Sequence, residues 1–137
     1  MPTLPTLPYM ERHVSLLGIL ASLWGALAAI IGVAMLLLAA GALAELLAPL
    51  EASVSFAAGL AAVGFALFGV FALVFGGAHI WAAALLRGHK PIGRILMLAL
   101  AIGNLLVIPF GTALGAYALW VLLKHEGHRL FEPTLQT

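Results

Sequence analysis

The strongest constraint in this sequence is the length of its uncharged runs. Asp, Glu, Lys and Arg are absent from three segments, residues 14–44, 52–86 and 95–123. The first run is far longer than the ~20 apolar residues that a helix needs to cross a bilayer. Hydrophobic residues make up 64% of the chain and charged residues 8%, and a small water-soluble fold has too much surface to hide that many apolar side chains. The sequence therefore predicts an integral membrane protein built of helices.

The third run can be one long tilted helix or a tight hairpin. Its centre reads Ile108-Pro109-Phe110-Gly111-Thr112. Pro109 lacks a backbone donor and disfavours helix at Ile108. Gly111 permits a sharp turn, and Thr112 is suited to cap the helix that follows. These residues favour the hairpin.

Charge supports the same choice, because cytoplasmic loops of membrane proteins are enriched in Lys and Arg. A hairpin places residues 87–94 and 124–129, which hold five of the six basic residues, on one side of the membrane. The loop between Glu45 and Glu51 holds none. We therefore predict an all-α, four-transmembrane-helix bundle with both termini cytoplasmic and the last two helices forming a short hairpin. Its arms, of ~14–18 apolar residues or ~21–27 Å, need snorkelling by Arg94 and Lys124 or local thinning of the bilayer.

The prediction treats residues 1–137 as a single membrane domain. Three prolines in the first eight residues predict an extended N-terminal tail rather than a signal peptide. The expected segments are the N-terminal tail 1–12, helices 13–45, 52–87, 92–108 and 111–127, and the C-terminal tail 128–137.

Two helix faces are candidates for packing. Gly18, Gly25 and Gly32 recur every seven residues, so they lie on one stripe and allow another helix to approach closely, either within this chain or from a second copy. The second predicted helix carries a broad aromatic face. That face either contacts the core or lipid, or it binds a pigment, quinone or partner subunit. Its residues are Phe65, Phe68, Phe71 and Phe75, with Trp81 near the cytoplasmic interface.

Polar residues inside membrane segments are costly and need an explanation. His79 follows Gly76-Gly77-Ala78, and such small neighbours suit ligation of haem or chlorophyll, whereas a hydrogen-bonded histidine near interfacial water is the simpler interpretation. Asn104 and Tyr117 lie near the middle of the last two predicted helices. We expect them, with Thr112, to make interhelical hydrogen bonds that pin the hairpin; a substrate site is the alternative.

Other classes of site find little support. His125 and His128 are three residues apart but do not form the His-Glu-x-x-His zinc motif, so we interpret them as part of a solvated tail rather than a metal site. The net charge of +1 predicts no nucleic-acid partner. No phosphate-binding loop, nucleophile elbow or paired carboxylate occurs, and we therefore expect no enzyme.

The last third of the chain contains a series of short motifs: Arg94-Ile95-Leu96, Asn104-Leu105-Leu106, Pro109-Phe110-Gly111-Thr112, Gly115, Tyr117 and Leu119-Trp120-Val121-Leu122-Leu123. With these motifs the chain resembles a group of small uncharacterised bacterial four-helix integral membrane proteins. This resemblance implies the bacterial inner (cytoplasmic) membrane and the count of four helices, but no activity.

These observations lead to a functional hypothesis. Without a buried charge or catalytic set, but with small-residue and aromatic faces, the chain is expected to be a non-enzymatic accessory or scaffold subunit of a larger membrane complex. Its partners would be lipid and other membrane protein subunits, and respiratory or photosynthetic complexes fit as hosts. The alternative is a small oligomeric channel or transporter, in which Asn104, Thr112 and Tyr117 line a polar path.

Overall fold

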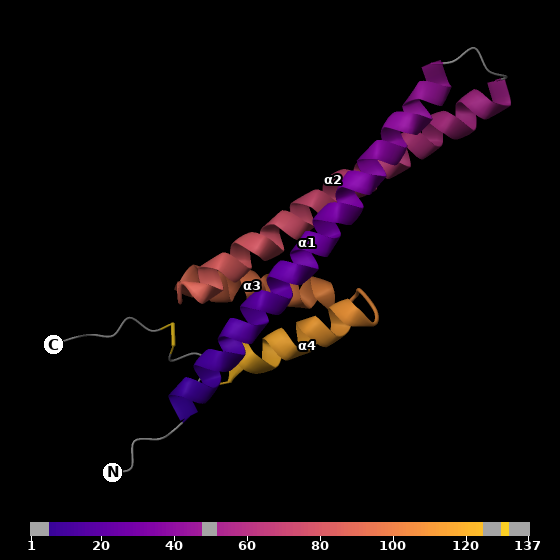
Figure 1. Cartoon of the computed structure of the whole chain (residues 1–137). Coiled ribbons are helices and arrows are strands. Elements are labelled where there is room, and N and C mark those ends of the chain that lie inside the picture. Colours follow the sequence, from indigo (N-terminus) through magenta and orange to yellow (C-terminus); the bar gives the residue numbers. More distant parts are fainter. Residues whose placement is uncertain (1–5, 48–51, 125–129, 132–137) are drawn as a thin grey trace, which may run out of the picture. The chain divides into compact units, whose positions relative to one another are not determined.

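The computed structural model describes residues 6–47, 52–124 and 130–131, and these residues form four helices (Figure 1). They are α1 (Thr6–Leu47), α2 (Ala52–Arg87), α3 (Pro91–Asn104) and α4 (Phe110–Leu123). No strand occurs in this described part of the chain, so the predicted all-α fold with four helices is confirmed. Two helical segments, Pro8–Leu47 and Val54–Arg87, are long and apolar enough to cross a membrane.

The start of α1 corrects the sequence prediction. Residues 6–12 are helical rather than part of an extended tail. Pro8 is compatible with this because it lies in the first helical turn, where backbone amides need no partner within the helix. Met10 is fully buried in the core and fixes this turn against the rest of the protein.

The other bounds agree more closely with the predicted ones. Helix α2 has the predicted bounds, whereas α3 ends at Asn104 rather than at residue 108, because the chain already turns before Pro109. Helix α4 ends at Leu123, and the backbone of Lys124 is extended. The rest of the predicted α4 and most of the C-terminal tail lie outside the described residues, although Phe131 in that tail is buried in the core.

The chain divides into two compact units. The first, called the hairpin unit below, contains α1 up to Trp24, α2 from His79 onward, and α3 with α4. The second, called the two-helix unit, is Gly25–Ala78. In the hairpin unit, α3 and α4 fold back on each other as the predicted hairpin.

The hairpin unit has a core to which all four helices contribute. Small residues alternate with larger ones, so that the helices approach closely and leave room for Leu and Met side chains. The fully or almost fully buried residues are Met10, Val14, Leu17 and Ala21 of α1, Ala82, Ala83 and Leu86 of α2, Met97 and Ala101 of α3, Ala118, Val121 and Leu122 of α4, and Phe131.

The two-helix unit is held by close backbone approach. A Cβ atom added at Gly32 would lie 2.9 Å from the Gly69 oxygen, and one at Gly76 would lie 2.5 Å from the Gly25 oxygen. Only glycine fits these positions. Because it has no side chain, the two helix backbones lie close together and gain many weak van der Waals contacts. At Gly77, by contrast, an added Cβ would meet nothing within 4 Å. The predicted small-residue stripe thus faces α2 of the same chain.

A tight turn joins α2 to α3. The amides of His89 and Lys90 donate to the carbonyls of Leu86 and Leu85, the pattern of a Schellman motif. His89 occupies the left-handed position of this motif, with φ 52°, where glycine is the usual residue. The turn lets α3 start at once with Pro91, which suits a first helical position.

Candidate functional site

The buried polar groups of the hairpin unit form one short network. The Trp24 indole N–H donates to Oδ1 of Asn104 at 3.1 Å, and Nδ2 of Asn104 lies 2.8 Å from Nε2 of His79. His79 is 0% exposed and Asn104 is 1% exposed. The network therefore joins α1, α2 and the C-terminal end of α3 inside an otherwise apolar core.

The chemistry of the indole group fixes the direction of both hydrogen bonds. An indole nitrogen can only donate, so the Asn104 atom that faces it must be the carbonyl oxygen. The Asn104 amide then presents its NH₂ group, also a pure donor, to His79. Consequently Nε2 of His79 accepts this bond, and the imidazole is neutral with its proton on Nδ1.

This geometry bears directly on the two interpretations of His79. Because the side chain is wholly buried, it does not reach interfacial water, and that part of the sequence interpretation is wrong. Its Nε2 lone pair is engaged by Asn104, so ligation of haem or chlorophyll through this atom would require Asn104 to move. The arrangement instead suits a hydrogen bond that fixes three helices.

The residues expected to pin the hairpin do so by different pairings from those expected. Asn104 bonds to α1 and α2, and the Tyr117 hydroxyl lies 2.8 Å from Nδ1 of His13 on α1. Thr112 does not cap α4; its hydroxyl donates to the Leu105 carbonyl at 2.9 Å and closes the tip of the hairpin. Asn104, Tyr117 and Thr112 thus have three different sets of partners.

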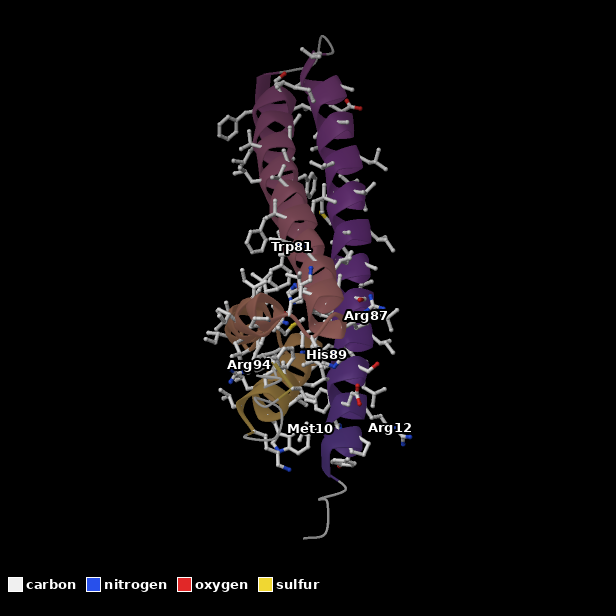
Figure 2. All side chains as sticks on the ribbon, turned by 90° about the vertical axis from the view of Figure 1, so that its left-hand side faces the viewer. Met10, Arg12, Trp81, Arg87, His89 and Arg94 are labelled. Atoms are coloured by element: carbon white, nitrogen blue, oxygen red, sulfur yellow. The ribbon has the colours of Figure 1, made fainter. Side chains whose placement is uncertain are left out.

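At the other end of the hairpin, cationic side chains secure its base. Arg94 Nε donates to the Leu122 carbonyl at 3.1 Å, which satisfies one of the last carbonyls of α4. Lys124 Nζ lies 5.3 Å from the centre of the Trp120 ring, a cation–π distance. Figure 2 shows Arg94 and Arg12 pointing outward on opposite sides of this unit.

Aromatic rings gather beside this base. The His13 ring lies 4.4 Å from Tyr9 and 5.5 Å from Trp120, between ring centres, and Trp120 stacks on Tyr117 at 6.1 Å. Tyr9 and Trp120 are exposed at their outer sides. Rings with an apolar body and a polar edge, next to cations, are typical of the membrane–water interface.

The predicted aromatic face of α2 is only partly exposed. Phe68 and Phe71 are exposed, whereas Phe65 and Phe75 are half-buried. Phe71 and Phe75 stack with ring centres 5.9 Å apart. Trp81, in the hairpin unit, is exposed. The outward side chains of this face are therefore large, apolar and available to lipid or to another protein.

The remaining candidates are few. His125, His128 and Glu51 lie outside the described residues, and Glu45 is exposed at the end of α1. Among the side chains that the structure describes, no group of three His, Asp or Glu residues is close enough together to hold a metal ion.

Sequence reasoning did not find two members of these contacts, His13 and Trp24. In the sequence, His13 directly precedes the first uncharged run and Trp24 lies within it. The signal that would have found them is a pair of rings with polar nitrogen atoms on α1, eleven residues apart, which can meet Asn104 and Tyr117 of the hairpin.

No protein-family model, curated protein or solved structure matches this chain. Its function has to be inferred from the arrangement of its own residues.

Proposed function

We propose that this chain is a multi-pass protein of the bacterial inner membrane that acts as a non-enzymatic accessory or scaffold subunit of a larger membrane complex. Helices α1 and α2 cross the bilayer, both termini lie in the cytoplasm, and the outer helix faces pack on partner subunits and lipid. The observation that carries this proposal is the separation of polar and apolar groups. Every buried side-chain polar atom in the described residues has a partner within the protein, while the outward faces are apolar.

Charge distribution supports the orientation. The two-helix unit, residues 25–78, contains no Lys or Arg. All six basic residues of the chain lie in the sequence of the hairpin unit. Positively charged loops stay on the cytoplasmic side, so this distribution supports cytoplasmic termini and a loop between α1 and α2 on the outer side.

The exposed surface of the two-helix unit supports a role in assembly. Large apolar side chains are exposed along both helices, including Ile30 of α1 and Leu60, Leu67 and Phe71 of α2. Lipid covers such a surface without further contacts, but stacked phenylalanines also offer a rigid face with little side-chain entropy to lose on binding. Helix association in membranes depends on this kind of packing.

The experiment that tests the proposal is purification of the native complex in mild detergent, followed by mass spectrometry of its subunits and a visible spectrum. We expect stoichiometric partner subunits, and a haem or chlorophyll band if the host complex is respiratory or photosynthetic. The variant Phe68→Ala with Phe71→Ala should lose these partners. Leu37→Ala, which removes an equally exposed side chain from α1, should retain them.

The opposite result is a colourless particle that contains only this chain. It would overturn the accessory-subunit proposal and favour the oligomeric channel or transporter instead. Flux measurements on reconstituted vesicles would then be the next step.

A further inference from the structure

The α3–α4 hairpin is too short to cross a bilayer. Each arm has 14 residues, or about 21 Å of helix, against a hydrocarbon core of about 30 Å. The spacing of the contacts between the hairpin and α1 also indicates a short hairpin. The hairpin binds α1 at His13, through Tyr117, and at Trp24, through Asn104. These two positions on α1 are eleven residues apart, which is about 16 Å along its axis.

The two ends of the hairpin have opposite character. Its base holds Lys90, Arg94 and Lys124, together with the exposed ring of Trp120. Its tip is formed by apolar residues that point away from the protein: Leu106 is 86% exposed, Ile108 82% and Phe110 75%. A tip in water would not favour three large apolar side chains at such exposure.

The backbone of the tip is adapted to an apolar environment. The amides of Leu105, Leu106 and Val107 donate to carbonyls of the last turn of α3, and the amide of Thr112 donates to the Val107 carbonyl. The Thr112 hydroxyl donates a hydrogen bond to the Leu105 carbonyl, and Pro109 has no amide hydrogen that needs an acceptor. Unpaired backbone groups are costly in hydrocarbon, and these bonds leave fewer of them in the turn.

From these observations we infer that α3 and α4 form a re-entrant hairpin. It enters from the side that carries the basic residues, its tip contacts the lipid acyl chains of that leaflet, and it returns to the same side without crossing. Lipid is therefore the molecule that covers the exposed side chains of the tip. This inference rests on the membrane location proposed above, but it replaces the expected four crossings with two.

The absence of cysteine from the chain makes labelling of single introduced cysteines a direct test. Ile108→Cys places a thiol at the tip, His89→Cys one in the exposed turn between α2 and α3, and Glu45→Cys one at the far end of α1. A membrane-impermeant maleimide is applied to right-side-out and to inverted vesicles. We expect His89→Cys to react only in inverted vesicles, Glu45→Cys only in right-side-out vesicles, and Ile108→Cys in neither.

A depth measurement completes the test. A bimane fluorophore on Ile108→Cys, attached in detergent before reconstitution, should be quenched by lipids with a nitroxide on the acyl chain more strongly than by lipids with a nitroxide on the headgroup. Labelling of Ile108→Cys in right-side-out vesicles would overturn the inference and indicate a full crossing. Labelling in inverted vesicles, or an absence of quenching by acyl-chain nitroxides, would equally overturn it, because the tip would then lie in water or against protein.

The two control positions keep this result separate from the proposed topology. If His89→Cys and Glu45→Cys react from the same side, α2 does not cross the membrane as proposed. Quenching at Ile108→Cys by lipid still decides whether the hairpin tip inserts.

Discussion

Replacement of Asn104 by leucine tests whether the buried network holds the hairpin unit together. The variant removes the acceptor for the Trp24 indole and the donor to His79. Leaving a buried polar group without a partner costs about 1–3 kcal/mol, whereas a hydrogen bond between membrane helices is worth about 0.6 kcal/mol on average. Because the half-buried Trp24 indole and Nε2 of the fully buried His79 both lose their bond to Asn104, we expect the free energy of unfolding to fall by about 2–4 kcal/mol.

The assay is reversible unfolding in mixed detergent micelles. Met97→Leu, on the same helix and equally buried, is the matched control, because a volume-conserving apolar change should cost less than about 1.5 kcal/mol. Combining Asn104→Leu with His79→Leu should cost less than the sum of the two single losses, since both changes break the same Asn104–His79 hydrogen bond. Additive losses, or an unchanged stability in Asn104→Leu, would refute the reasoning. In the parent protein, ¹⁵N NMR should place the His79 proton on Nδ1.

Three further predictions follow from local geometry. Gly76→Ala should lower the free energy of unfolding by about 1–3 kcal/mol, because the added Cβ atom would clash with the backbone of α1. Gly77→Ala, which has open space around it, should be neutral or raise stability by up to about 1 kcal/mol. Equal effects of the two variants would contradict the close approach of the two helices. Thr112→Val should cost about 1 kcal/mol by removing the bond to the Leu105 carbonyl, and hydrogen exchange of the hairpin tip should then rise; unchanged exchange would argue against this closure. His89→Gly should stabilise the protein by up to about 1 kcal/mol because it relieves a left-handed backbone conformation, and a lower melting temperature would mean that the side chain's contacts outweigh that strain.

Much of the fold was predictable from the sequence because the signals are local. The bounds of α2 follow from charges at its two ends, and the hairpin follows from Pro109 and Gly111 between two apolar runs. Residues 6–12 were predicted to be an extended tail because three prolines lie in the first eight residues. Pro8, however, lies in the first turn of α1, where its missing amide hydrogen leaves no helical hydrogen bond unmade. Burial of Met10 against residues that are distant in the sequence stabilises the helical conformation of this segment.

The pairing of polar groups was not predictable in the same way. Asn104 was expected to bond within the hairpin, yet its partners are 80 and 25 residues away. Which residues meet depends on how each helix is rotated, and successive residues of a helix point about 100° apart. A sequence with apolar residues on every face gives no preferred rotation, so the partner of Tyr117, which is 104 residues away, emerged only from the structure.

The central claim, that this chain assembles with other membrane subunits, is tested most directly by photo-crosslinking in intact membranes. A photoreactive benzoyl-phenylalanine replaces Phe71 in one variant and Leu37 in another, since both side chains are exposed and lie on different helices. The account predicts a single cross-linked protein partner at Phe71, identifiable by mass spectrometry and lost in the Phe68→Ala background. Cross-links to lipid alone, or only to further copies of this chain, would contradict it.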